Sequence, residues 1–292
     1  MIKIIIFISL IINILLILII KKKTLKGLLN KKKVQSVDLE KLNDIFINSK
    51  IDENLYGPKE DVIVKNFCIP SNNKIVGMTS NYEAWIISSL SKVSNTIFEF
   101  GTCSGKTTYL MALNSPESAK IISLTLKPEN LGNIEKNNLD NKISFRNIIN
   151  ESIYKNFLFT GSELENKIDV IFQNSLDFDE TQYNNFFDLI FIDGGHTYSV
   201  VKSDTQKAFK MINKNGIILW HDYVPGKTSA KDVVKLINEI SREKKIYNIK
   251  DTSLCYFKNE IQNLIKNNIK INIIGDIKNL PKKVRSRLLS SM

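Results

Sequence analysis

The chain has 292 residues, of which 43% are hydrophobic and 24% charged, and it contains three cysteines. The aliphatic content excludes an intrinsically disordered protein, and so few cysteines in a chain of this length exclude a disulfide scaffold. The formal net charge of +11 raises the question of a nucleic-acid or membrane partner.

The positive charge is concentrated at the two ends. Eight lysines and no acidic residue precede Asp38, and from residue 258 onward eight basic residues oppose two acidic ones. The stretch between carries a small negative charge, and the whole chain has only four arginines. Nucleic-acid-binding domains gather basic residues over the binding surface, so we expect no nucleic-acid partner.

The first predicted element is a membrane anchor. Residues 4–20 are apolar apart from Ser9 and Asn13, which approaches the length of a membrane-spanning helix. A lysine cluster follows directly, without the small-residue site of a cleaved signal peptide. Lysines on that side favour a cytoplasmic body. We therefore expect a single-pass anchor over 1–21 and a basic polar spacer over 22–60 with one short helix at 37–49; a buried core helix is the alternative.

From residue 79 onward, helical and strand patterns alternate. The predicted helices are 82–93, 106–113, 199–212 and 229–243. The predicted strands are 96–100, 120–126, 167–172, 188–192, 216–220, 246–249 and 253–257. Short β-branched runs separated by helices predict a doubly wound, Rossmann-like α/β domain with a mostly parallel sheet, and the last two strands are close enough to form a hairpin. We place this domain at 61–258 and a basic tail at 259–292.

The loop at 99–108 (EFGTCSGKTT) fits three nucleotide-binding patterns to different degrees. A phosphate-binding P-loop requires a glycine where Phe100 stands, and the dinucleotide fingerprint requires glycines at Cys103 and Lys106. The third pattern, acid-x-Gly-x-small-x-Gly, holds a nucleoside cofactor. It uses Glu99, Gly101, Cys103 and Gly105. Cys103 is interpreted as a small loop residue, and Lys106 as a solvated residue at a helix start.

Together with two further runs, this loop resembles the class I S-adenosylmethionine-dependent methyltransferases. The runs are TIFEFGTCSGKTT (96–108), DLIFIDGGHTYSVVKSDTQKAFKMINKNGIILWHDY (188–223) and TSLCYF (252–257). The resemblance covers about residues 79–258. More narrowly, the chain is similar to the branch of the family that contains small-molecule and sugar O-methyltransferases. It implies a seven-stranded sheet whose last strand is antiparallel.

The resemblance also implies S-adenosylmethionine as the cofactor. The glycine loop would lie under its methionine part, with Glu99 toward the amino group. Thr125 stands where the family commonly has an acid facing the ribose, and Asn174 with Ser175 stands at the position that contacts adenine. The implied cofactor-binding residues are Glu99, Gly101, Thr102, Cys103, Gly105, Thr125, Asn174, Ser175 and Asp193.

The chain has only two histidines, and each lies near an aspartate just after a predicted strand: Asp193 with His196, and His221 with Asp222. Carboxyl ends of parallel strands meet at one edge of a sheet, so we expect one cleft to hold all four. The aspartates offer oxygen ligands for Mg²⁺, while His221 would suit a softer metal. The predicted metal ligands are Asp193, Asp222 and His221. Ordinary packing of both histidines is the alternative.

Methyl transfer requires in-line alignment of donor and acceptor and removal of a proton from the acceptor. His196, with an ordinary pKa near neutrality, is the predicted base, and Asp193 the second catalytic residue. We therefore expect O-methylation of a sugar or small hydroxylated metabolite, with a divalent cation as an optional cofactor. The partners would be a small-molecule or glycan acceptor and a membrane, contacted through the N-terminal helix and the basic tail.

Two other functions remain open from the sequence. Lys106 and Thr107 after Gly105, with the strand DLIFID, leave a P-loop-like nucleotide hydrolase or kinase. Thr125 and Asn174, which replace acids common in the family, leave a non-catalytic binding module with a methyltransferase fold. The sequence does not identify the acceptor or the oligomeric state.

Overall fold

The computed structural model describes residues 34–38, 61–69, 71–72 and 74–259, together with Asn13 and Leu18. The predicted membrane anchor, most of the spacer and the basic tail thus lie outside the described residues. Among the helices within those ranges, none combines the length and apolarity needed to cross a bilayer.

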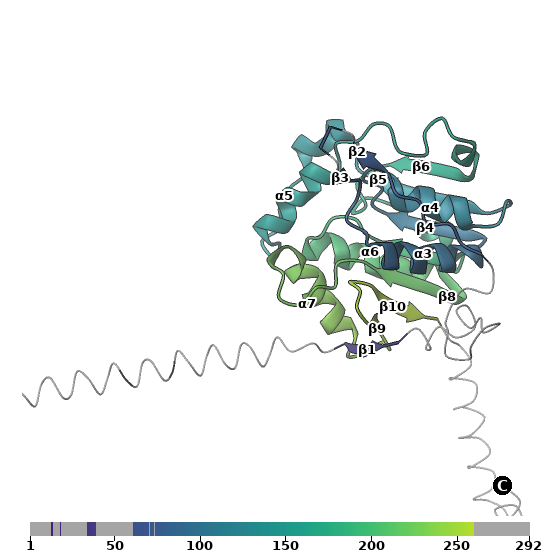
Figure 1. Ribbon diagram of the computed structural model, residues 1–292. Helices are drawn as coiled ribbons and strands as arrows, with labels where there is room; N and C mark the ends of the chain where they lie inside the picture. The colour runs from purple at the N-terminus through teal and green to yellow at the C-terminus, as the bar shows by residue number, and fades with distance from the viewer. Residues whose placement is uncertain are drawn as a thin grey trace, which may run out of the picture.

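An eight-stranded sheet forms the centre of the domain (Figure 1). In spatial order its strands are β1 (Gln35–Val37), β9 (Tyr247–Ile249), β10 (Cys255–Lys258), β8 (Ile212–Trp220), β7 (Phe187–Ile192), β4 (Thr96–Phe100), β5 (Lys120–Thr125) and β6 (Ile168–Phe172). Only β10 is antiparallel to its neighbours, β8 and β9. The predicted α/β architecture, with an antiparallel last strand, is confirmed for the seven strands other than β1.

Helices cover both faces of this sheet (Figure 1). They are α3 (Asn81–Lys92), α4 (Lys106–Asn114), α5 (Lys142–Glu151), α6 (Tyr198–Met211) and α7 (Lys231–Ile240), and a small hairpin pairs β2 (Cys68–Ile69) with β3 (Lys74–Ile75). Phe98 belongs to the core cluster that includes side chains of α6 and α7, whereas Ile97 belongs to the cluster that includes those of α3 and α4. Neighbouring strand residues thus enter opposite cores, which explains why the strands read as continuous apolar runs.

The eighth strand was not predicted. Gln35–Val37 lies parallel to β9, with Val37 opposite Ile249, at the edge of the sheet (Figure 1). Val34 and Val37 are 3% and 7% exposed, so this end of the predicted spacer is part of the folded domain. The helix predicted to begin at Val37 is wrong at its start, because the open edge of β9 offers backbone partners that local sequence pattern does not reveal.

The remaining predicted elements agree with the structure apart from shifts of a few residues at their ends, which is ordinary for helix and strand boundaries. The largest difference is in the stretch after β5, where no helix was predicted. Here α5 begins after Asn141, whose side-chain oxygen caps it by accepting from Ile143 N at 2.8 Å. After this cap, α5 lies across the carboxyl ends of the strands and forms one wall of the cavity described below.

Candidate active site

A cavity of about 460 Å³ opens at the carboxyl ends of β4, β5, β6, β7 and β8. Ligands bind at this edge of parallel α/β sheets, near the point where the strand order reverses, here between β4 and β7. The predicted residues in its wall are Gly101, Thr102, Cys103, Thr125, Asn174, Ser175, Asp193, His196, His221 and Asp222. Glu99 and Gly105 are not part of the wall.

The glycine loop holds the end of β4 against the end of β7. Gly101 has φ +94°, and a Cβ there would lie 2.3 Å from the backbone oxygen of Asp193. Asp193 N in turn donates to Phe100 O at 2.9 Å. Only glycine permits both this conformation and this approach. At the other end of the loop, Gly105 faces Phe157 and Phe159 rather than the cavity, so its role is packing.

Glu99 lies beneath the loop, fully buried. Its Oε2 accepts from the hydroxyls of Ser123, at 2.6 Å, and Thr108. Burial raises the pKa of Glu99 to about 8. Its Oε1 has no hydrogen-bond partner among the described residues.

The two histidines and two aspartates predicted to share a cleft lie together. His196 Nε2 is 3.0 Å from Asp222 Oδ2 and 3.8 Å from Asp193 Oδ1. His221 Nδ1 is 3.1 Å from Asp193 Oδ1 and 3.5 Å from Asp222 Oδ2. Asp222 adopts φ 61°, a left-handed conformation that aspartate tolerates better than most residues. The cluster therefore alternates acids and imidazoles around one point.

The surroundings of both histidines favour their protonated forms. Burial alone would lower their pKa values, but the surrounding carboxylates outweigh it. The nearby carboxylates of Asp193, Asp222 and Glu151 raise the pKa of His196 to about 9, and Asp193 and Asp222 likewise raise that of His221. This differs from the ordinary pKa that sequence analysis assigned to His196.

One oxygen or nitrogen atom from each of Asp193, His196 and Asp222 lies within 4.8 Å of the others, which is a spacing that can hold a metal ion. His221, predicted as a ligand, is not in this set. It is 7% exposed and lies between Asp193 and Glu83, whose Oε2 is 3.7 Å from its Nε2. The structure therefore replaces His221 with His196 as the imidazole of the candidate metal site.

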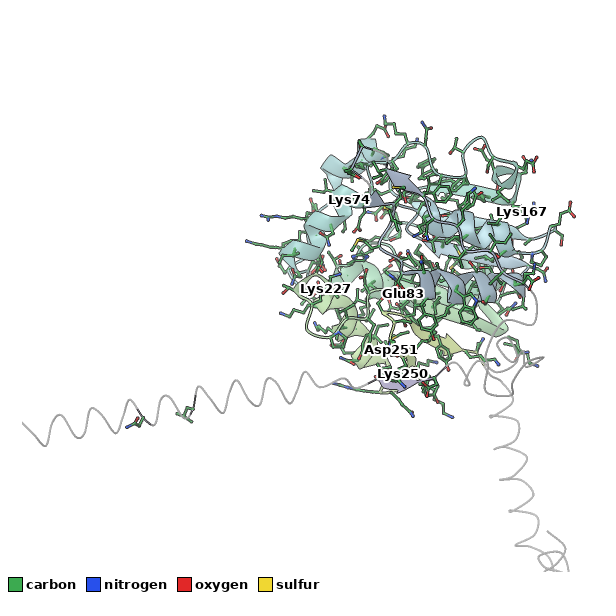
Figure 2. The ribbon with its side chains drawn as sticks, in the orientation of Figure 1. Lys74, Glu83, Lys167, Lys227, Lys250 and Asp251 are labelled. Carbon is green, nitrogen blue, oxygen red and sulfur yellow. The ribbon has the colours of Figure 1, made fainter. Side chains whose placement is uncertain are left out.

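Glu83 is a site residue that sequence analysis missed. It lies on α3 (Figure 2), where it forms a capping box with Ser80. Its other oxygen accepts from the backbone and hydroxyl of Ser253, both at 2.7 Å. Glu83 thus links the start of α3, the loop before β10 and His221. The S-x-x-E pattern was a visible signal, but it indicates a helix cap rather than a site.

The segment from residue 134 to 152 supplies much of the remaining wall, and it carries no motif from which the roles of its residues could be predicted. Asp140 accepts from the backbone and hydroxyl of Ser199 at 2.9 and 2.8 Å, which fastens this segment to the start of α6. Glu151 and Lys227 lie in the wall near the histidine–aspartate cluster, and Lys227 Nζ is 3.9 Å from Asp222 Oδ1 (Figure 2 labels Lys227).

The prediction for Lys106 is wrong, whereas the one for Cys103 agrees with the structure. Lys106 is 3% exposed rather than solvated, because the first turn of α4 packs beneath residues 77–79 and its Nζ donates to Thr79 O at 3.3 Å. Burial raises the pKa of the Cys103 thiol to about 11, which keeps it protonated and agrees with its interpretation as a loop residue rather than a nucleophile.

A family model described as a methyltransferase domain matches residues 98–223. None of the curated proteins matches the chain closely enough to count as a relative.

Solved methyltransferases are among the similar structures. The PaMTH1 methyltransferase of Podospora anserina with bound S-adenosylhomocysteine has 14% identity and a TM-score of 0.45, over 63% of this chain and 80% of that one. An O-methyltransferase of Bacillus cereus with the same ligand has 14% identity and a TM-score of 0.41, over 65% and 86%. The O-methyltransferase TomG of Streptomyces achromogenes with bound S-adenosylmethionine has 10% and 0.42, over 62% and 82%. These TM-scores are too low for the function of those proteins to be assigned to this chain.

Proposed function

We propose that this chain, which contains a class I S-adenosylmethionine-dependent methyltransferase domain, transfers the methyl group of S-adenosylmethionine to a hydroxyl of a sugar or similarly polar small molecule. The observation that carries the proposal is the placement of the histidine–aspartate cluster directly against the glycine loop, in one cavity.

The residues of the cavity fit S-adenosylmethionine. Gly101 lets the loop approach the backbone of Asp193, so that loop and cluster share one cavity wall, and one carboxyl oxygen of Glu99 has no hydrogen-bond partner among the described residues. Thr125 ends β5 in the wall, and Asn174 and Ser175 follow β6. The same loop does not suit a triphosphate, because Gly105 N already donates to Thr102 O at 2.7 Å instead of pointing at a ligand. The cofactor supplies a methyl group on a positively charged sulfur.

The cluster also fits a divalent cation. Asp193, His196 and Asp222 would hold it, and two carboxylates with one imidazole are a donor set that accepts Mg²⁺ or Mn²⁺. The cation would supply a Lewis acid that makes the acceptor hydroxyl more acidic. Because such ligands bind metal in their deprotonated forms, metal binding is expected to release the proton that His196 otherwise holds.

Without a bound cation, His196 is the group of the chain that is placed to receive the acceptor's proton, and it does so from its deprotonated form. Its Nε2 lies 3.0 Å from Asp222 Oδ2, so the carboxylate stabilises the imidazolium that forms. His221 and Glu83 lie behind them and hold Asp193 in place. The glycine loop, which adjoins Asp193, would hold the cofactor that supplies the methyl group.

The wall chemistry favours a polar acceptor over a planar aromatic one. Within the described part of the chain, the aromatic rings of Phe, Tyr or Trp in the cavity wall are those of Phe100 and Phe145. Hydrogen-bonding side chains are more numerous in the wall, and outside the cluster they include Asp140, Asn147, Glu151, Ser152, Lys227 and Ser229. Such groups match several hydroxyls, whereas a flat apolar ring would leave them without partners.

Calorimetric titration of the full-length chain tests the cofactor assignment. We expect saturable binding of S-adenosylhomocysteine and no binding of ATP, because the N–H groups of Gly101 and Gly105 already donate to Leu124 O and Thr102 O. Binding of ATP without binding of S-adenosylhomocysteine would contradict the proposal and favour the P-loop alternative.

A further inference from the structure

The outer face of α5 and its flanking residues is largely apolar. Exposed side chains follow one another along it at spacings of three and four residues, which places them on one side of a helix. This outer stripe consists of Leu139, Ile143, Arg146, Ile149 and Ile153. The inner side of α5 faces the protein, where Ser144 and Ile148 are buried. Exposed apolar side chains are ordinary when they are scattered singly, but a contiguous set of them marks a contact surface.

The charges of α5 are divided between the same two sides. Its exposed charged residues are Lys142 and Arg146, and both are cations. Its acid, Glu151, lies in the cavity wall, and Asp140 just before the helix is buried. The outer face therefore combines aliphatic side chains with positive charge and exposes no acid of α5. This is the pattern of a helix that lies on the surface of an anionic bilayer.

The outer stripe adjoins the rim of the cavity. The inner side of α5 supplies Asn147 and Glu151 to the cavity wall. Another part of the wall is Met78, which is nevertheless 88% exposed. Met78 follows the β2–β3 hairpin, whose Ile69 and Ile75 are exposed as well. Exposed apolar side chains thus belong to two separate segments that border the same cavity.

Two observations favour a bilayer over a protein as the partner of the outer stripe. A second copy of the chain, placed against it by two-fold symmetry, would bring Lys142 and Arg146 of both copies together without an exposed acid of α5 to oppose them. In addition, the apolar residues 4–20 and the lysine-rich ends of the chain predict that it is held at a membrane. The domain would then be held next to a bilayer.

We propose that the outer stripe of α5, together with Met78, docks on the surface of an anionic bilayer, so that the cavity opens toward the lipid headgroups. The isoleucines enter the boundary between headgroups and acyl chains, and Lys142 and Arg146 pair with lipid phosphates. This contact is distinct from the predicted anchor and from the basic tail. It does not depend on the reaction that the cavity performs.

Spin labels on the full-length protein in vesicles test this contact. One label is attached at Ile149→Cys in the stripe and another at Val93→Cys as the matched control, both in a Cys68→Ser background because Cys68 is exposed. Val93 is also an exposed apolar residue, but it lies just before β4, at the amino ends of the strands. Collisions of the label with oxygen, which dissolves in lipid, and with a water-soluble nickel chelate report its surroundings. Labelling of the parent protein corrects for Cys103.

We expect the label at residue 149 to be accessible to oxygen and protected from the chelate in vesicles of phosphatidylcholine with phosphatidylglycerol. In phosphatidylcholine alone it should remain in water, and the label at residue 93 should remain in water in both kinds of vesicle. Equal accessibility of the first label in the two kinds of vesicle, or an equal change at residue 93, overturns the proposal. If Ile149→Cys does not fold, Ile153→Cys replaces it with the same expected result.

Reversing the two cations distinguishes the bilayer from other partners of the stripe. Lys142→Glu with Arg146→Glu should lower the ratio of docked to undocked label by at least about 25-fold, since each basic residue near an anionic surface contributes about fivefold. Lys120→Glu with Lys214→Glu makes the same change of charge at the amino ends of β5 and β8 and should leave the label in lipid. A thermal melt checks that each variant is folded.

A label at residue 149 that stays protected from the chelate after this charge reversal would contradict the proposal. It would show that a second copy or the chain's own N-terminal segment covers the stripe.

Discussion

Replacing Asp222 with asparagine is expected to lower the turnover number by about 100-fold to 10,000-fold, the range seen when a group that handles the reacting proton is lost. The change removes the negative charge 3.0 Å from His196 and one ligand oxygen of the candidate metal site. It keeps the shape of the side chain, and asparagine tolerates the left-handed φ of 61° at this position. Affinity for S-adenosylhomocysteine should change by less than about threefold, because the lost interaction acts on the reacting groups rather than on the cofactor.

Asp251→Asn is the matched control for this variant. Asp251 has the same φ of 61° and is exposed just after β9, next to Lys250 (Figure 2). Any general effect of losing an acid from a left-handed position appears in both variants. The turnover of Asp251→Asn should equal that of the wild type. If Asp222→Asn kept more than about a tenth of the wild-type turnover, the assigned role of the Asp222–His196 pair would be wrong.

Replacing Gly101 with alanine should reduce the free energy of unfolding by roughly 3–5 kcal/mol and abolish measurable cofactor binding. The added Cβ would meet the Asp193 oxygen at 2.3 Å and the Gly194 Cα at 2.5 Å. Both are backbone atoms at the end of β7, so no side chain can rotate away. Relief requires the ends of β4 and β7 to separate, which would displace Asp193 and with it the histidine–aspartate cluster. Urea denaturation and calorimetry measure the two effects.

Gly226→Ala is the control that distinguishes the effect of the close backbone contact at Gly101 from the effect of a positive φ on stability. Gly226 has φ +97°, nearly the value at Gly101, but nothing lies within 4 Å of where its Cβ would be. Strain alone should therefore cost about 1 kcal/mol at Gly226. Equal losses of stability in the two variants would show that the approach of Gly101 to Asp193 is not the constraint described here.

Local pattern was sufficient to predict most of the sheet and the centre of the site. The strands are apolar runs bounded by turns, and parallel strands bring their carboxyl ends to one edge, so residues far apart in sequence such as Asp193 and Asp222 were expected together. The sequence pattern did not predict which strand pairs with β9 at the edge of the sheet. Gln35–Val37 is short and polar in its middle, and it becomes a strand only because β9 has an open edge.

The missed site residues share a different cause. Glu83 and Asp204, which is a buried acid of the cavity wall, both lie on helices, whereas sequence analysis looked for site residues just after the strands. A signal for Asp204 was nevertheless present: it occupies the apolar stripe of α6 with Val201, Ala208 and Met211 at helical spacing, and all four are buried. An acid in such a stripe indicates a buried carboxyl group that needs a partner. Which cavity it enters depends on tertiary packing alone.

The central claim is that this cavity methylates a polar hydroxyl compound, and transfer of a labelled methyl group tests it most directly. Full-length protein is incubated with S-adenosylmethionine carrying a labelled methyl group, Mg²⁺ and either a pool of sugars and sugar conjugates or a pool of catechols. We expect label to enter the sugar pool, and Asp222→Asn to reduce that transfer at least about 100-fold. Transfer to catechols alone, or binding of the cofactor with no transfer to either pool, would contradict the account.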